Sequence, residues 1–410
     1  MHATPCRFCG TPLEQSFIDL GVQPPSNSYL RASELNCSEH FHPLHAYVCT
    51  KCFLVQLEQF ESPEEIFSDY AYFSSYSESW LKHAKNYCQM VSDRFGLNGQ
   101  HQVIEVASND GYLLQYFTAR GIPVLGVEPA ANVARVAEQK GVKTRVGFFG
   151  RATARQLVED GYAADLLIGN NVLAHVPDLN DFVAALRMTL KPDGVITMEF
   201  PHLLRLMRDC QFDTIYHEHF SYFSLSAAER VFHAHGMRLF DVDELPTHGG
   251  SLRIYGCHLE GPHPLDTRVA ELKRREEDAG LNKIGTYEGF GERVRVVKRN
   301  LLSFLISAKN EGKNVVAYGA AAKGNTLLNF CGIGPDMIDY VVDANPHKQG
   351  LYLPGTRIPI ATPDKIASTR PDYVLILPWN LKHEIMEMNA NVKDWGGQFV
   401  LPIPDVEIVG

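Results

Sequence analysis

Two pairs of closely spaced cysteines near the N-terminus constrain this chain more than any other feature. Cys6 and Cys9 form one CxxC pair, and Cys49 and Cys52 form the other. Four thiolates in two such pairs can close a tetrahedral site around zinc and leave no open coordination position. We therefore predict a structural zinc site, with a redox-active CxxC pair as the alternative. The other cysteines are scattered singly, so no disulfide framework is expected.

Downstream of the cysteines, apolar strands alternate with helical patterns. Strand candidates at 103–106 and 165–169, and another that ends at Glu128, are separated by helical spacing. A helix is predicted from 179 to 190, followed by a strand at 194–201. This alternation predicts an α/β fold with a doubly wound, mostly parallel sheet.

A second alternating pattern occupies the C-terminal part of the chain. Its strand candidates are 315–319, 340–345, 373–379 and 398–404. They predict a second Rossmann-like unit, which a charged helical stretch at 264–313 connects to the first. We therefore expect a zinc-binding module at 1–66, a central domain at 67–262 and a C-terminal domain at 263–410.

The charge balance limits the classes of partner. The 410 residues carry a formal net charge of −10, and no dense run of lysine or arginine occurs. Nucleic acid and anionic membrane surfaces are therefore disfavoured, and local cations must hold any anionic substrate. No apolar run has the length of a signal peptide or a membrane span, so we expect a cytoplasmic location by default.

Polar and small residues follow three of the predicted central strands. In an open α/β sheet, ligands bind at these carboxyl ends. A carboxylate at the end of the second strand can accept both hydroxyls of a ribose, and a turn of small residues lets a ligand approach the backbone. We predict S-adenosylmethionine as the cofactor over NAD, because the first turn lacks GxGxxG. The predicted cofactor-binding residues are Glu105, Ser108, Asn109, Gly111, Glu128 and Asn170.

The segment 216–222, YHEHFSY, is the densest polar and aromatic cluster in the chain. A histidine with a pKa of about 6.5 can take up a proton at neutral pH, and a nearby carboxylate can orient it. A hydrogen-bonded core cluster is the alternative. His175 follows the third strand, at the mouth of the predicted cofactor site. The alternative is that it is an ordinary histidine of a surface loop.

Two glycine-containing turns are candidates for anion binding. The segment 247–253, THGGSLR, combines glycines with a hydroxyl group and Arg253. The segment 317–325, AYGAAAKGN, follows a strand and opens a helix, so its backbone N–H groups and Lys323 can bind phosphate. For the first segment the alternative is an ordinary turn. For the second it is a Rossmann turn retained only for folding.

These motifs, taken in order, resemble the nucleotide-sugar 3-C-methyltransferases of branched deoxysugar biosynthesis. The likeness rests on the zinc knuckles, EVASNDG, NNVLAHVPD, YHEHFSYFS, THGGSLR and YGAAAKGN, and it covers nearly the whole chain. It implies a 4-keto-6-deoxy sugar, linked to a nucleoside diphosphate and held between the central and C-terminal domains. It further implies that His219 is the base that removes the C3 proton.

The resemblance also implies neighbours for this base. They are Glu218, Tyr216, His175 and a tyrosine of the FSSYS segment, which we assign to Tyr76, with Tyr72 second and Tyr70 as a further alternative. The expected substrate-binding residues are Tyr222, Arg253, Lys323 and Asn325.

Two other functions stay open at this point. One is an O- or N-methyltransferase of a small metabolite, which needs a base but no adjacent ketone. The other is a zinc-stabilised protein that uses both Rossmann-like units only to sense ligands. The sequence fixes neither the nucleotide nor the oligomeric state.

Overall fold

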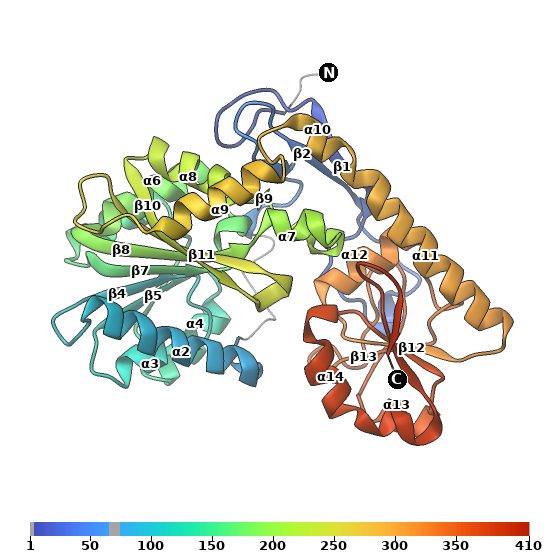
Figure 1. Cartoon of the computed structure of the whole chain (residues 1–410). Coiled ribbons are helices and arrows are strands. Elements are labelled where there is room, and N and C mark those ends of the chain that lie inside the picture. The colour runs from blue at the N-terminus through green and yellow to red at the C-terminus, as the bar shows by residue number, and fades with distance from the viewer. Residues whose placement is uncertain (1–3, 65–73, 410) are drawn as a thin grey trace.

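The chain folds into three lobes, each built on its own sheet. The computed structural model describes residues 4–64 and 74–409. Figure 1 shows the N-terminal lobe at the top, the central lobe at the left and the C-terminal lobe at the lower right. The predicted α/β fold class is confirmed. None of the described helices combines the length and the apolarity that a membrane span requires.

The N-terminal sheet is antiparallel and takes its last strand from elsewhere in the chain. Its order is β1-β2-β3-β9, with β1 (Gln15–Gln23), β2 (His42–Val48), β3 (Val55–Leu57) and β9 (Ser221–Tyr222). The short β9 pairs with β3 at Val55↔Tyr222 and Gln56↔Ser221. The segment 216–222 is therefore hydrogen-bonded to the lobe that carries the cysteines.

The central sheet has seven strands in the order β10-β11-β8-β7-β4-β5-β6. The five strands from β8 to β6 are parallel, whereas β11 runs antiparallel to both of its neighbours. The strands are β4 (Val103–Val106), β5 (Val124–Glu128), β6 (Thr144–Val146), β7 (Ala164–Asn170), β8 (Leu190–Pro201), β10 (Met237–Leu245) and β11 (Ser251–His258). β4 is buried at every position, as is typical of a central parallel strand, and Glu105 is its one charged residue.

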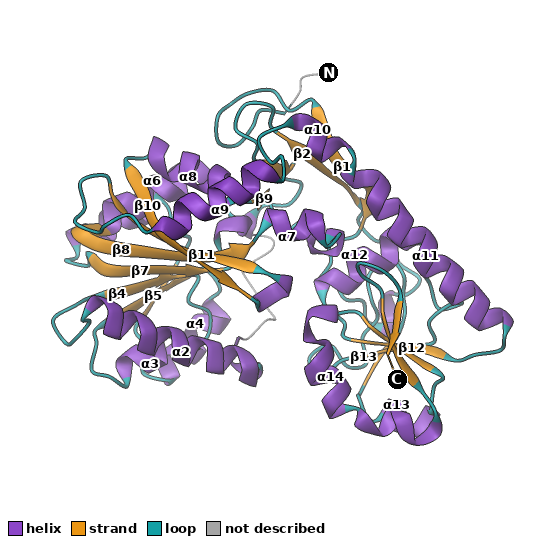
Figure 2. Cartoon of the chain, in the orientation of Figure 1, coloured by secondary structure: helices purple, strands orange, loops and turns teal. Residues whose placement is uncertain are grey.

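Helices cover both faces of this sheet. Figure 2 shows α6, α8 and α9 on one side and α2, α3 and α4 on the other. The central helices are α2 (Glu78–Phe95), α3 (Leu114–Thr118), α4 (Ala131–Gln139), α5 (Arg151–Glu159), α6 (Leu179–Thr189), α7 (Leu203–Arg208) and α8 (Leu225–Ala234). The side chain of Ser77 caps the N-terminus of α2, and Gly96, at φ +63°, ends it in the left-handed conformation that suits glycine.

The C-terminal sheet has six strands in the order β14-β13-β12-β15-β16-β17, parallel except for the last. Its strands are β12 (Val315–Tyr318), β13 (Val341–Val342), β14 (Ile360–Ala361), β15 (Tyr373–Ile376), β16 (Gln398–Leu401) and β17 (Glu407–Val409). Its helices are α12 (Ala322–Cys331), α13 (Lys365–Thr369) and α14 (Lys382–Met388). The antiparallel edge strand β17 was not predicted.

Three helices lead from the central lobe to the C-terminal lobe: α9 (Thr267–Asp278), α10 (Ile284–Glu288) and α11 (Phe290–Asn310). Apolar side chains of α11 share one continuous core with the N-terminal and C-terminal sheets, for example Leu301 with Phe17 and Val315. The cysteines instead belong to the core of the central lobe. The N-terminal lobe is therefore packed against both of the others.

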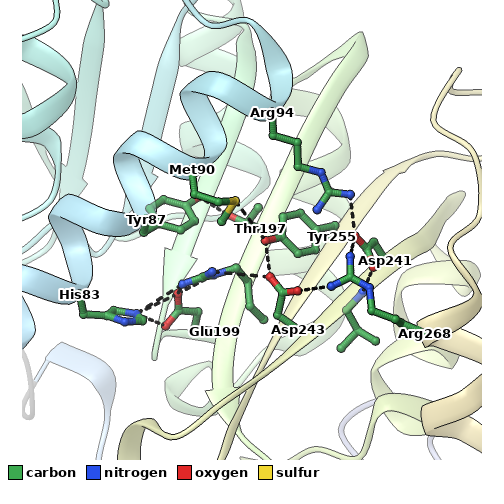
Figure 3. A network of polar contacts seen from close by, with 12 residues as sticks. His83, Tyr87, Met90, Arg94, Thr197, Glu199, Asp241, Asp243, Tyr255 and Arg268 are labelled. Atoms are coloured by element: carbon green, nitrogen blue, oxygen red, sulfur yellow. Dashed lines mark hydrogen bonds and ion pairs between the residues drawn. The ribbon is translucent and has the colours of Figure 1, made fainter.

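A buried ion-pair network fastens α2 to the central sheet (Figure 3). The carboxylate of Glu199 in β8, which is 1% exposed, accepts from Arg253 Nε at 2.8 Å and lies 2.9 Å from His83 Nε2 of α2. Arg253 also lies 3.7 Å from Asp243 and 4.7 Å from the ring centroid of Tyr87. Burial opposes ionisation of Glu199, but His83 and Arg253 outweigh it and lower the pKa of this carboxyl.

Replacing Glu199 leaves Arg253 buried without its main partner. We expect Glu199→Ala to lower the free energy of unfolding by about 3–5 kcal/mol in urea titrations at pH 7. The contribution of this carboxylate is present above the pKa of an unfolded glutamate and is lost as the pH falls through the lowered pKa of the folded state. The matched control is Glu292→Ala, which breaks an exposed pair with Arg299 and is expected to change little. Equal effects of the two substitutions would contradict this account of the network.

Candidate active site

The four N-terminal cysteines bring their sulfur atoms to one point. Sγ of Cys6 lies 3.6 Å from Sγ of Cys52, and Sγ of Cys9 lies 3.5 Å from Sγ of Cys49. All four sulfur atoms lie within 4.8 Å of one another. Bonds of about 2.3 Å to a tetrahedral zinc ion separate thiolates by about 3.8 Å, so this cluster fits zinc. Four thiolates fill the coordination sphere, as a structural site requires.

The backbone of the cysteine knuckles is hydrogen-bonded to the central lobe. Asn180 donates from Nδ2 to the carbonyls of Arg7 and Phe8 at 3.1 and 2.9 Å. Arg7 donates to the carbonyl of Pro177 at 2.7 Å, and Arg230 donates to that of Cys52 at 2.8 Å. These contacts reach the loop after β7, which also carries His175.

The predicted cofactor residues gather at the carboxyl ends of β4, β5 and β7. Glu128 accepts the backbone N–H groups of Asn109 and Ala130 at 2.9 Å each, so this carboxylate joins the ends of β4 and β5. Gly111, at φ +75°, has no room for a side chain, because a Cβ atom there would lie 3.0 Å from Cγ2 of Val142. The turn is therefore closed tightly against the sheet.

Strained backbone and unsatisfied polar atoms mark this edge as a ligand site. Ala107, Asn109 and Asn171 have positive φ angles of 54°, 49° and 55°. Oγ of Ser108 and Oδ1 of Asn170 are buried and have no hydrogen-bond partner among the described residues. Burial raises the pKa of the nearby Glu105 well above its ordinary value. The donor and acceptor set fits a polar nucleoside ligand.

His219 lies in a buried pocket that fixes its tautomer. Its Nδ1 atom lies 2.9 Å from the carbonyl oxygen of Thr214, which can only accept, so Nδ1 carries the proton. Nε2 is then the basic nitrogen, and the hydroxyl of Tyr216 donates to it at 2.8 Å. Burial lowers the pKa of His219 well below its ordinary value, and His175 contributes to this shift. The imidazole is therefore neutral at pH 7.

The neighbours of His219 are also buried. The ring of His175 lies 4.6 Å from that of His219, and the ring of Tyr222 lies 6.2 Å away. Burial lowers the pKa of His175 to about 4 and raises that of Glu218 to about 7. The backbone N–H of Phe220 donates to the carbonyl of Ala174 at 2.7 Å, which joins the two catalytic candidate loops. The structure thus brings the histidine candidates together.

The C-terminal candidates Lys323 and Asn325 lie at the start of α12. The ammonium group of Lys323 is 3.4 Å from the carbonyl of His248 and 5.0 Å from the ring centroid of Trp379. Asn325 donates to the carbonyl of Ser26, and its Oδ1 atom is buried without a partner among the described residues. Burial lowers the pKa of Lys323, opposed by Asp213.

Two other candidates make contacts outside the pocket of His219. The guanidinium of Arg253 is ion-paired with the carboxylate of Glu199. Its contact with a diphosphate stays a prediction. Tyr76 is 63% exposed, and its ring lies 6.4 Å from that of His347 in the C-terminal lobe. The alternatives Tyr70 and Tyr72 lie outside the described residues.

Sequence reasoning missed several polar residues of this region. Trp379 donates from Nε1 to the fully buried carboxylate of Asp213 at 2.8 Å, and burial raises the pKa of Asp213 to about 6. Gly249 makes room for Trp379, because a Cβ atom there would lie 2.3 Å from its ring. His248, at φ +55°, lies 3.3 Å from Asn171. The THGG segment was the available signal for His248.

Comparison with known proteins identifies the family. Three family models match the chain. They describe a zinc binding domain at residues 6–67, a methyltransferase domain at 80–242 and a C-methyltransferase C-terminal domain at 246–404. The C-methyltransferase NovU of Streptomyces niveus is 35% identical over 407 residues, which cover 98% of this chain and 96% of that protein. The chain belongs to the C-methyltransferase family. It is an enzyme that depends on S-adenosylmethionine, and its zinc site is structural.

Other similarities are partial. A ubiquinone biosynthesis O-methyltransferase of Bartonella bacilliformis is 26% identical over 96 residues, or 23% of this chain and 39% of that protein. The solved structure of PH0226 from Pyrococcus horikoshii OT3 is 16% identical, with a TM-score of 0.38, and covers 48% of this chain and 99% of that one.

Loss of zinc from the C-methyltransferase is expected to loosen the N-terminal lobe. Cys49→Ser removes one of four thiolates, so bound zinc should fall from one per chain to a small fraction, and methyl transfer should fall with it. Zinc is measured by atomic emission and activity by release of S-adenosylhomocysteine. Cys37→Ser, which changes an exposed cysteine outside the cluster, is the control and should keep its zinc. A chain that lost zinc and kept full activity would refute the structural role.

Proposed function

We propose that this C-methyltransferase transfers a methyl group to C3 of a 4-keto-6-deoxy sugar linked to a nucleoside diphosphate. The observation that carries the proposal is the buried, neutral imidazole of His219, whose basic nitrogen is defined by the bond from Nδ1 to Thr214. A C–H bond becomes acidic enough for such a base only beside a carbonyl group whose enolate is stabilised. The C4 ketone supplies that carbonyl group.

In the proposed reaction, the Tyr216 hydroxyl turns from Nε2 of His219 to the C4 oxygen, which frees the lone pair of Nε2. Nε2 then takes the proton from C3, and the electron pair of the C–H bond moves to the C4 oxygen. Tyr216 and His175 stabilise the developing enolate by hydrogen bonding. S-adenosylmethionine supplies an electrophilic methyl group when bound. The new carbon–carbon bond forms from C3 as the ketone reforms, while the methyl–sulfur bond breaks and its electron pair stays on sulfur, so that neutral S-adenosylhomocysteine would leave. His219 then releases its proton to solvent.

The proposed cofactor contacts are those at the carboxyl ends of the central strands. Glu128 holds the ribose hydroxyls, and Asn170 with the turn from Glu105 to Gly111 receives the methionine part. The buried Ser108 and Asn170 atoms without partners support this assignment.

The diphosphate is assigned to the first turn of α12. This ten-residue helix presents backbone N–H groups at its N-terminus, and Lys323 adds a positive charge in a protein of net charge −10. Asn325 and Tyr222 complete the proposed substrate contacts, and Glu218 and Tyr76 complete the catalytic set.

His219→Asn tests the base. The amide cannot take up the C3 proton, so we expect loss of both methyl transfer and exchange of the C3 hydrogen in deuterated water, followed by NMR and mass spectrometry. His217→Asn is the matched control, because this neighbouring histidine instead contacts the carbonyl of Pro43 at 3.3 Å and should retain exchange. Persistent C3 exchange in His219→Asn would rule out His219 as the base.

Lys323→Ala tests the diphosphate site. Loss of a charged hydrogen-bond donor is expected to raise the KM for the sugar nucleotide roughly tenfold or more, while the KM for S-adenosylmethionine stays constant. Lys365→Ala is the control, because that lysine lies over Tyr340 in the same lobe. An unchanged KM for the sugar nucleotide in Lys323→Ala would contradict the assignment.

A further inference from the structure

The loop between β1 and β2, residues 24–41, leaves the N-terminal lobe and crosses to the C-terminal lobe. Tyr29 donates from its hydroxyl to the carbonyl of Ala320 at 2.6 Å, and Leu30 pairs with Tyr352 through two backbone hydrogen bonds. Farther along, Glu39 accepts from Arg357 Nε at 2.9 Å. We call this segment the crossing loop.

Lys348 adds contacts that hold the crossing loop on the C-terminal lobe. Its ammonium group donates to the same carbonyl of Ala320 at 2.8 Å and lies 5.3 Å from the ring centroid of Tyr29. Asn325 adds a third contact by donating to the carbonyl of Ser26. The loop is therefore fixed on the turn that opens α12, to which the proposed diphosphate site belongs.

One residue of the crossing loop points back to the central lobe. The side-chain amide of Asn27 donates to Oε1 of Glu218, which is 191 residues away in the sequence. Glu218 is 7% exposed and directly precedes His219. Asn27 itself is exposed, and the hydroxyl of Tyr29 lies 3.4 Å from its amide oxygen. The crossing loop thus contacts both the C-terminal lobe and the segment that carries His219.

We propose that Asn27 is a positioning residue for the methyl-transfer reaction, acting through the carboxyl group of Glu218. The proposal rests on the proposed function, in which Glu218 is an active-site neighbour of the base. Asn27 holds the carboxyl in one orientation, and the crossing loop holds Asn27. The contacts of the crossing loop with the C-terminal lobe are in this way linked to the orientation of the Glu218 side chain.

The charged and titratable groups around Glu218 give the hydrogen bond a second effect. Burial raises the pKa of Glu218 to about 7, whereas the amide of Asn27 lowers it, Glu61 raises it and Lys348 lowers it. His175, which is neutral at pH 7, contacts the backbone of Glu218. A donor N–H stabilises the ionised carboxylate, so loss of Asn27 raises the pKa further and leaves more Glu218 protonated at pH 7.

A double-mutant cycle with Asn27→Ala and Glu218→Ala tests the link, because alanine at position 218 has no oxygen to accept from Asn27. Asn27→Ala is expected to lower kcat roughly tenfold, with an unchanged KM for S-adenosylmethionine, because one hydrogen bond to a charged group is lost. In the Glu218→Ala background the same substitution should add less than about twofold, because the two residues act as one unit. Effects that multiply in full would contradict the proposal.

Glu39→Gln is the matched control, because it weakens another anchor of the crossing loop without touching Glu218. Its effect on kcat should multiply with that of Glu218→Ala. If Asn27 served only to seat the loop, Asn27→Ala would behave in the same way as Glu39→Gln.

A titration of Glu218 keeps the proposal testable without turnover. In protein labelled with ¹³C at glutamate carboxyls, the Glu218 signal is assigned by its absence in Glu218→Gln. We expect Asn27→Ala to raise the pKa of this carboxyl and Glu39→Gln to leave it in place. An unmoved Glu218 titration in Asn27→Ala would overturn the proposal. If the wild-type enzyme methylates no 4-keto sugar nucleotide, the proposed function fails, while this titration still tests the link.

Discussion

The pairing of β3 with β9 is the interaction on which the rest of the structure depends. β3 begins three residues after Cys52, the last zinc ligand, and β9 begins two residues after His219. The N–H of Leu57 also donates to the carbonyl of Phe220 at 3.0 Å. The zinc cluster and the catalytic segment are therefore adjacent parts of one hydrogen-bonded sheet.

This arrangement explains why a small N-terminal lobe needs zinc. The lobe has little apolar surface of its own to bury, and its sheet shares a core with α11 and the C-terminal lobe. Four thiolates bound to one zinc ion stabilise the other end of the lobe, where the two CxxC segments pack on the central lobe. The lobe thus packs against both larger lobes.

Local patterns in the sequence predicted the parts of the structure that depend on short spacing. The CxxC pairs converge as expected, and β4, β5 and α6 lie where apolar runs and periodicity indicated. The polar and aromatic cluster at 216–222 was also visible, because its members lie within seven residues of one another. Each of these features is encoded by neighbours in the chain.

Contacts between distant segments escaped prediction. Asn27 meets Glu218 across 191 residues, and Trp379 meets Asp213 across 166. The ion pair of Arg253 with Glu199, 54 residues earlier, was likewise not visible in the glycine-containing turn that precedes Arg253. No periodicity in the sequence encodes such pairs, because they arise only when separate lobes or strands pack together.

The position of the transferred methyl group tests the central claim most directly. The enzyme is incubated with a 4-keto-6-deoxy sugar nucleotide and S-adenosylmethionine labelled with ¹³C in its methyl group, and the product is examined by NMR. The account predicts a methyl carbon bonded to ring carbon C3. A methyl carbon bonded to oxygen or nitrogen would contradict it.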